Sequence, residues 1–133
     1  MNLNMTMEEM FREFEFNERP EEMITEVNGM VLPDDYLDFM RLHDGGEGSL
    51  GENNYGCFYR LKELGEINEE YDVSNSWPDH IVIGSDMSGQ LWTYDAREKN
   101  YCQIDSCNTD DDTYYTISGS FEEFLINMDE ELK

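Results

Sequence analysis

The sequence changes its pattern at Trp77-Pro78, and this change limits the possible folds more than any other feature of the chain. Four short segments of apolar or alternating character follow it, namely HIVIG (80–84), QLWTYD (90–95), NYCQI (100–104) and TYYTI (113–117). In the second of them Trp92 and Tyr94 fall on one face and the residues between them on the other, which is the period of two of a strand. The second half of the chain therefore predicts a β-sheet.

Helical patterns dominate before Trp77. Near the N-terminus, apolar residues follow one helical face at the spacing i, i+3, i+4 and i+7, and these are Met7, Met10, Phe11 and Phe14. Further helices are predicted for PEEMITEVNG (20–29), for LPDDYLDFMRLHDGG (32–46) and, as a short segment, for KELGEINEEY (62–71). One predicted strand, YGCFYRL (55–61), lies between them.

The last segment, SFEEFLINMDEEL (120–132), predicts the most regular helix. Ser120 and Glu123 have the spacing of a capping box. An apolar stripe follows, made of Phe121, Phe124, Leu125, Met128 and Leu132. Helices, then strands, then a closing helix are typical of the α+β class. We expect one domain over residues 1–133, in which a twisted, mainly antiparallel sheet is flanked by N-terminal helices and a C-terminal helix.

The segment IGSDMSGQLWTYDA (83–96) raises the question of a catalytic serine. A nucleophile elbow requires the pattern G-x-S-x-G, and neither Ser85 nor Ser88 has a glycine two positions away on both sides. Nothing in the spacing directs His43 or His80, the two histidines, toward Ser88. Small polar residues between two strands instead favour a hairpin turn. We therefore expect no catalytic residues and no enzyme activity.

The charge of the chain is unusual, because 32 acidic residues stand against 8 basic ones and give a formal net charge of −24. Such a surface repels nucleic acid and anionic membranes and attracts basic proteins. The acidic clusters are interleaved with apolar residues, which indicates a charged folded surface and not a disordered tail. An acidic surface that serves only solubility is the alternative interpretation. Like charge also disfavours self-association, so we expect a monomer.

The chain has three cysteines, Cys57, Cys102 and Cys107, and its N-terminus has no secretory signal pattern. An odd number of cysteines indicates free thiols in a reducing compartment, so we expect a cytoplasmic protein.

Cys102 and Cys107 could approach a metal, but no further ligand lies near them in sequence, and no metal is predicted. No glycine pattern for phosphate or dinucleotide binding is present, so we expect no cofactor. No apolar run reaches the roughly 18 residues of a membrane span.

Three segments occur in the order and spacing of a known family. The first, ITEVNGMVLPDDYLDFMRLHDGGEG (24–48), contains a Leu-Pro pair, then Tyr36 and Phe39, and a Gly-Gly helix end. The second, IVIGSDMSGQLWTYD (81–95), is a strand, a Gly/Asp-rich turn and an aromatic strand, and the third, SGSFEEFL (118–125), starts the closing helix. From about residue 20 to 132 the chain resembles the SMI1/KNR4, or SUKH, superfamily.

This resemblance implies an α+β fold with a twisted sheet flanked by helices. It also implies a function, because many bacterial members of that superfamily are immunity proteins that bind and neutralise a cognate toxin, often a nuclease, of a polymorphic or contact-dependent system. No shared catalytic residues come with the resemblance. Since a nuclease presents a basic cleft for phosphates, an acidic inhibitor is steered toward it. We therefore expect an immunity protein for a basic, nuclease-type toxin domain.

The residues that bind this partner are expected in two loops. DSCNTDDDTYY (105–115) places charge beside tyrosine, a mixture common in interfaces, and GGEGSLGENNYG (45–56) is a second loop loosened by glycines. The expected contact residues are Asp110, Asp111, Asp112, Tyr114, Tyr115, Glu47 and Glu52. Solvated loops with no partner are the alternative for both segments.

Three other functions stay open from the sequence alone. The first is a non-enzymatic regulatory adaptor that binds several host proteins, as eukaryotic relatives in the resembled superfamily do. The second is a nucleic-acid mimic, which needs carboxylates spaced like phosphates along one face. The third is a small hydrolase, which needs a base and a nucleophile brought together by the fold.

Overall fold

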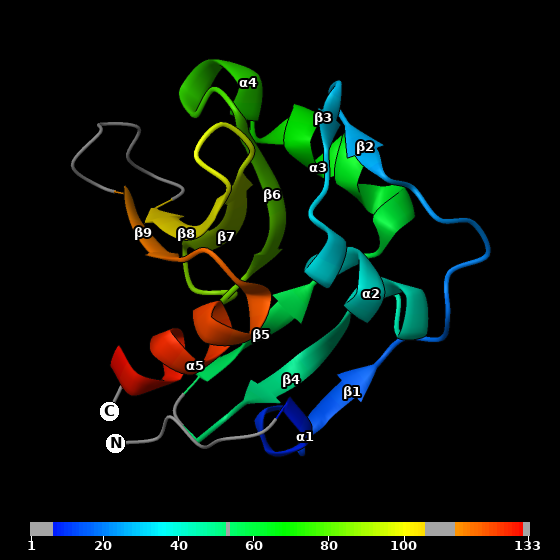
Figure 1. Cartoon of the computed structure of the whole chain (residues 1–133), viewed down its shortest axis with the longest axis vertical. Coiled ribbons are helices and arrows are strands. Elements are labelled where there is room, and N and C mark those ends of the chain that lie inside the picture. Colours follow the sequence, from blue (N-terminus) through cyan, green and yellow to red (C-terminus); the bar gives the residue numbers. More distant parts are fainter. Residues whose placement is uncertain (1–6, 53, 106–113, 132–133) are drawn as a thin grey trace.

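The computed structural model describes residues 7–52, 54–105 and 114–131, and its main feature is a seven-stranded antiparallel sheet in the order β1-β4-β5-β6-β7-β8-β9 (Figure 1). The strands of this sheet are β1 (Phe14–Phe16), β4 (Gly46–Leu50), β5 (Asn54–Phe58), β6 (His80–Ser85), β7 (Gln90–Asp95), β8 (Asn100–Asp105) and β9 (Tyr114–Ser118). A separate two-stranded sheet pairs β2 (Glu26–Val27) with β3 (Met30–Val31).

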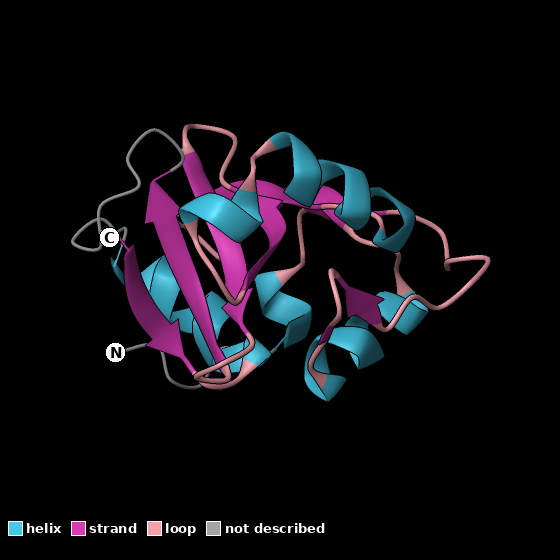
Figure 2. Cartoon of the chain, turned by 90° about the horizontal axis from the view of Figure 1, so that it is seen from above, coloured by secondary structure: helices cyan, strands magenta, loops and turns pink. Residues whose placement is uncertain are grey.

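Helices lie on both sides of the strands (Figure 2). They are α1 (Met7–Met10), α2 (Asp34–Leu42), the 3-10 helix η1 (Leu61–Glu63), α3 (Leu64–Glu70), α4 (Val73–Ser76) and α5 (Phe121–Glu131). Among the described residues no helix has the length and apolar character needed to cross a membrane. The α+β class and the antiparallel sheet expected from the sequence are confirmed.

The central strands are buried on both faces, which explains their apolar sequences. Every residue of β6 is buried. Ile81 and Ile83 belong to the main core, which also holds side chains of α2 and α5, whereas Val82 belongs to a second core with residues of α4. Alternation along the strand therefore sends successive side chains into two different cores. The alternation expected for β7 is confirmed in the same way, since Trp92 lies in the main core and Leu91 in the second.

The closing helix α5 begins as the sequence predicts. Ser120 Oγ accepts a hydrogen bond from the backbone N–H of Glu123 at 3.1 Å. The backbone N–H of Ser120 donates to Ser118 Oγ at 3.2 Å, and Glu123 Oε2 accepts the hydroxyl of Ser118 at 3.0 Å, so Ser118 stands between the two residues of the predicted capping box. The apolar stripe is buried in the main core at Phe121, Phe124, Leu125 and Met128.

The segment between β6 and β7 is a hairpin turn, as expected. Asp86 Oδ1 accepts hydrogen bonds from the backbone N–H groups of Ser88 at 2.8 Å and Gln90 at 3.1 Å. Gly89 has a φ of 107°, a conformation that favours glycine. Ser88 is exposed at the tip, and His80 lies at the opposite end of β6 with its Nδ1 2.8 Å from Thr93 Oγ1. The structure therefore gives Ser88 a turn position and not the surroundings of a nucleophile.

The predicted N-terminal helix is wrong beyond its first turn. Helix α1 ends at Met10, and Phe14 is the first residue of β1. This strand pairs with β4, with Phe14 opposite Gly48 and Phe16 opposite Gly46. A Cβ atom on Gly48 would lie 2.8 Å from the carbonyl oxygen of Glu13, so the missing side chains allow β1 to approach closely. This long-range pairing outweighs the local helical pattern.

Two further expectations are corrected in the same half of the chain. The helix predicted for 20–29 is absent, and the segment instead enters the β2-β3 hairpin. Asn28 and Gly29, with φ of 54° and 80°, form its turn, and Asn-Gly is a strong hairpin signal. The segment 45–56, expected as a loop loosened by glycines, forms most of the β4-β5 ladder.

Candidate functional site

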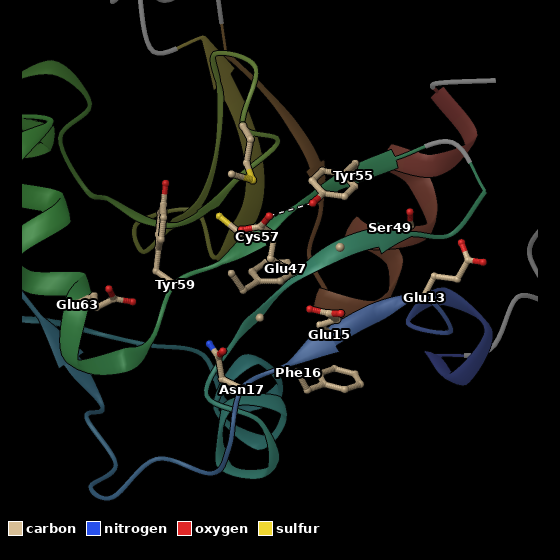
Figure 3. Close-up of a pocket in the computed structure, with 14 residues that line it drawn as sticks. Glu13, Glu15, Phe16, Asn17, Glu47, Ser49, Tyr55, Cys57, Tyr59 and Glu63 are labelled. Atoms are coloured by element: carbon tan, nitrogen blue, oxygen red, sulfur yellow. Dashed lines mark hydrogen bonds between the residues drawn. The ribbon is translucent and has the colours of Figure 1, made fainter.

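An open acidic groove of about 820 Å3 crosses β1, β4 and β5 (Figure 3). Four glutamates line it, and all of them are exposed: Glu13, Glu15, Glu47 and Glu63. None of the described residues that line the groove is a lysine or an arginine. The groove therefore concentrates negative potential on one part of the sheet, where it attracts cationic groups.

The strand register places two of these carboxylates side by side. Glu15 of β1 lies directly opposite Glu47 of β4, and Glu47 lies directly opposite Cys57 of β5. Opposed residues in an antiparallel pair point to the same face, with Cβ atoms about 4.5–5.5 Å apart. Like charges at such positions destabilise a sheet. A feature that works against folding indicates a site kept for another purpose.

Aromatic side chains stand beside the carboxylates. The hydroxyl of Tyr55 donates a hydrogen bond to Glu47 Oε2 at 2.9 Å, and 49% of the Tyr55 residue surface is exposed (Figure 3). That hydrogen bond is the largest cause of a raised pKa for Tyr55, with smaller contributions from burial and from the charge of Glu47. Tyr59, half-buried at the same groove, also has its pKa raised, to about 12, chiefly by burial. Both phenols are neutral at pH 7, and since the one O–H of Tyr55 already donates to Glu47, its oxygen can accept a hydrogen bond from a cationic partner.

Cys57 lies at the floor of the groove but is not an activated nucleophile. Burial, followed by the charge of Glu47, raises the pKa of its thiol to about 11. A cysteine acts as a nucleophile in its thiolate form, and the raised pKa keeps Cys57 mainly in the thiol form at neutral pH. The groove thus combines exposed carboxylates with neutral phenol groups. This arrangement is suited to binding basic side chains.

The structure separates the contact residues expected from the sequence. Glu47 is in the acidic groove, and Glu52 is exposed beside a neighbouring hollow lined by Glu9, Arg12, Glu13, Ser49, Gly51 and Glu52. The backbone of Tyr114 and Tyr115 lies in β9, at the edge of the sheet opposite to β1. Asp110, Asp111 and Asp112 lie outside the described residues. Among the described residues, Tyr114 and Tyr115 therefore lie on strands away from Glu47.

Sequence reasoning missed Glu13, Glu15 and Tyr55 as site residues. The signal for the two glutamates was present in REFEF (12–16), where acidic and aromatic residues alternate with the period of a strand. The helical spacing of the preceding methionines concealed it. Tyr55 lies in the predicted strand 55–61 and in the expected loop 45–56, but it is not among the expected contact residues. Its position next to Glu47 depends on the β4-β5 register, which pairs Ser49 with Tyr55.

A second group of polar side chains is buried beneath α4 and away from the groove. His80 Nε2 lies 3.6 Å from Asp95 Oδ2, and both residues are 5% exposed. Burial lowers the pKa of His80 below its ordinary value, although the nearby charges of Asp95 and Asp79 oppose this change. Cys102 lies close to the same pair, and these three side chains are the described ones that could hold a metal ion.

Comparison with protein families gives one match that covers most of the chain. The model of the SMI1 / KNR4 family (SUKH-1) matches residues 21–127 of the 133. No curated protein matches the chain. The matched part includes Glu47, Tyr55 and the strands from β4 to β9, but it does not include β1 with Glu15. The chain belongs to the SMI1 / KNR4 family (SUKH-1).

Proposed function

We propose that this chain is a non-enzymatic immunity protein that binds and neutralises a basic, nuclease-type toxin domain through the acidic groove. Membership of the SMI1 / KNR4 family is consistent with an immunity role. The observation that carries the choice of surface is the direct opposition of Glu15 and Glu47 on an exposed face. A cationic side chain placed between the two carboxylates would be attracted to both and would offset their mutual repulsion.

Neutralisation follows from the chemistry of the toxin's own active site. A nuclease holds phosphates with lysine and arginine side chains, and these groups would enter the groove in place of a nucleic acid. The surrounding negative potential accelerates the encounter, while Tyr55 supplies exposed aromatic area next to Glu47. Fast capture matters because a single toxin molecule acts repeatedly on its substrate.

The proposal includes the cytoplasm as the place of action and a monomer as the active form. The described cysteines, Cys57 and Cys102, are not in disulfides, which favours a reducing compartment. A net charge of −24 opposes contacts between two copies of the chain. A cytoplasmic immunity protein would meet its toxin after the toxin has entered the cell.

Asp110, Asp111, Asp112, Tyr114 and Tyr115 remain our proposal for a second contact region, and Glu52 for a contact beside the groove. Their role is separate from that of the groove and needs its own variant. Alanine at positions 110, 111 and 112 is expected to slow association if the loop steers the toxin. Unchanged association and affinity would remove this region from the proposal and leave the groove intact.

The test compares two variants with equal charge. Glu15→Gln with Glu47→Gln removes two groove charges and keeps a side chain that can accept the Tyr55 hydroxyl. Glu26→Gln with Glu122→Gln removes two exposed charges from β2 and α5. Binding to a basic C-terminal toxin domain encoded by a neighbouring gene is measured at low and moderate salt. The groove variant should associate at least about tenfold more slowly, and the control should resemble the wild type.

Other results would contradict the proposed site or the proposed function. Equal effects of the two double variants would show that total charge matters and the groove does not. Failure of the wild type to bind or inhibit the toxin domain would contradict the immunity role. Several weak partners recovered from a host lysate would then favour the regulatory adaptor.

A further inference from the structure

Three adjacent strands bring together a nitrogen, an oxygen and a sulfur ligand in the interior of the protein. His80 of β6, Asp95 of β7 and Cys102 of β8 have ligand atoms that all lie within 4.8 Å of one another. His80 and Asp95 are each 5% exposed, and Cys102 is 0% exposed. A buried set of three different donor atoms restricts which metal ion can bind more than the carboxylates of the protein surface do.

The register of the sheet explains the cluster. His80 is directly opposite Asp95, and Cys102 is directly opposite Thr93, which lies two positions before Asp95 on β7. Because side chains of opposed residues share a face, all three ligands point to the side of the sheet that carries the second core. Only the folded sheet makes these residues neighbours, since they are far apart in the sequence.

The separation of the ligand atoms suits a shared metal ion. His80 Nε2 and Asp95 Oδ2 are 3.6 Å apart. Around a tetrahedral zinc ion with bonds of about 2.0–2.2 Å, two such ligand atoms lie roughly 3.4 Å apart. The Cys102 sulfur lies within 4.8 Å of both other ligand atoms, and zinc–sulfur bonds are longer, at about 2.3 Å.

Supporting hydrogen bonds hold the remaining atoms of two ligands. His80 Nδ1 lies 2.8 Å from Thr93 Oγ1, so a proton on Nδ1 leaves the Nε2 lone pair for a metal. Asp95 Oδ1 accepts the backbone N–H groups of Arg97 at 3.0 Å and Glu98 at 3.1 Å, which leaves Oδ2 toward His80. Outer partners of this type orient ligands in known zinc sites.

We infer that His80, Asp95 and Cys102 bind one Zn2+ ion, with water as the fourth ligand. Imidazole, carboxylate and thiolate are all donors that zinc accepts. Binding converts the Cys102 thiol to a thiolate and releases its proton to solvent, so the two anionic ligands balance the charge of the ion. This neutral balance favours a buried position. The inference does not depend on the proposed immunity function.

The cluster lies where one central strand begins and the next one ends. His80 is the first residue of β6 and Asp95 the last residue of β7, so the cluster lies at the outer end of these strands (Figure 1). The backbone there is tied together, because Ala96 N–H donates to the Asp79 carbonyl at 2.8 Å. Zinc would strengthen this end of the sheet, since an ion that binds only the folded state stabilises it.

The experiment uses the untagged full chain, stripped of metal by a chelator. Co2+ is added first, in a large excess of Mg2+ that occupies exposed carboxylates, and Zn2+ is then used to displace it. One equivalent of Co2+ should produce a thiolate-to-cobalt charge-transfer band together with the visible spectrum of a four-coordinate ion. One equivalent of Zn2+ should abolish both signals.

Variants assign the ligands. Cys102→Ser should remove the charge-transfer band and lower the zinc affinity by more than the roughly 10- to 100-fold that loss of an outer hydrogen bond produces. Thr93→Val should fall within that smaller range. Cys57→Ser and His43→Gln are matched controls, because they remove a cysteine and a histidine outside the cluster, and they should keep both the band and the affinity.

Specific results would overturn the inference. Wild-type protein saturated with Co2+ that lacks the charge-transfer band has no thiolate ligand. Zinc that Mg2+ displaces is bound only to surface carboxylates. A band that survives Cys102→Ser comes from another thiol. Circular dichroism checks that each variant is folded, and if Cys102→Ser does not fold, the wild-type spectrum and Thr93→Val decide.

Discussion

Asp35 at the start of α2 accepts a hydrogen bond from the backbone N–H of Phe121 at the start of α5, with 2.7 Å between Oδ2 and N. Its other oxygen, Oδ1, accepts the hydroxyl of Tyr101 at 2.6 Å. One carboxylate therefore connects α2, β8 and α5. Tyr101 is fully buried, and its pKa is raised far above the ordinary range by burial and by this hydrogen bond.

Asp35→Ala should lower the free energy of unfolding by about 1.5–3 kcal/mol, the value of hydrogen bonds to a charged group. It leaves the buried Tyr101 hydroxyl and the Phe121 amide without this acceptor. Asp35→Asn should have a smaller effect because it keeps one acceptor oxygen. Urea unfolding measures both. The neighbouring exposed residue provides the control, since Asp34→Ala should lose less than about 1 kcal/mol. Equal losses for Asp34→Ala and Asp35→Ala would contradict the connecting role.

The side chain of Asn68 in α3 bonds the backbone of Val82 in β6 as a neighbouring strand would. Its Oδ1 accepts the backbone N–H of Val82 at 2.7 Å, and its Nδ2 donates to the Val82 carbonyl at 3.0 Å. Asn68→Ala leaves both buried groups of Val82 without these bonds and should cost about 2–4 kcal/mol of stability. Asn75→Ala, on the exposed surface, should change stability by less than about 0.5 kcal/mol. Thermal and urea unfolding measure the stability of both variants. Equal losses of stability for Asn68→Ala and Asn75→Ala would contradict this role of Asn68.

Two glycines predict opposite effects of the same substitution. A Cβ atom on Gly56 would overlap the carbonyl oxygen of Ser85 and the ring of Trp92, whereas a Cβ on Gly65 of α3 meets nothing within 4 Å. Gly56→Ala should therefore destabilise the protein by about 3 kcal/mol through overpacking. Gly65→Ala should stabilise it by about 0.5–1 kcal/mol, because alanine favours the helix. A Gly56→Ala protein with an unchanged melting temperature would show that β5 and β6 can separate without loss.

The second half of the fold could be predicted from the sequence because its signals are local. Alternating and apolar strands, the turn at Asp86 and the cap at Ser120 each depend on residues close in the chain. The first half could not, because Phe14 follows two competing patterns. Its helical spacing is local, whereas the pairing with Gly48 that determines β1 spans 34 residues, from 14 to 48. Such pairing is visible only in the folded sheet.

The candidate site was predictable only in part for the same reason. The sequence predicts Glu47 as a contact residue from its acidic, glycine-rich surroundings, whereas Glu15 directly follows the segment predicted to be helical, which ends at Phe14. The opposition of Glu15 and Glu47 needs the register of β1 against β4. Likewise, Cys102 was considered as a metal ligand, but His80 and Asp95 join it only through the order of β6, β7 and β8.

Cys57 predicts a pH profile that differs from that of an ordinary thiol. Its pKa is raised to about 11, first by burial and then by Glu47, whereas the unperturbed value is 9.0. Because the folded state favours the thiol, the associated stability is present below pH 9 and decreases as the pH rises toward 11. Alkylation at Cys57, followed by peptide mass spectrometry, should accelerate about tenfold per pH unit up to about pH 11 in the folded protein. In urea the rate should level off near pH 9, and identical profiles in both states would contradict the shift.

Glu15→Lys should give a more stable protein that associates more slowly with a basic toxin domain. Lysine opposite Glu47 replaces a repelling pair by an attracting pair, which should raise the free energy of unfolding by about 0.2–1 kcal/mol. The same change places a positive charge in the groove proposed to receive cationic side chains, so association with a basic toxin domain should slow more than for Glu15→Gln. Urea unfolding and stopped-flow association measure the two effects on one preparation. Glu122→Lys is the control, since it changes the net charge equally on α5 and should leave association nearly unchanged. A site maintained for a partner is expected to trade stability for function. A Glu15→Lys protein that gains stability and keeps full association would therefore mean that the opposed carboxylates have no role in binding.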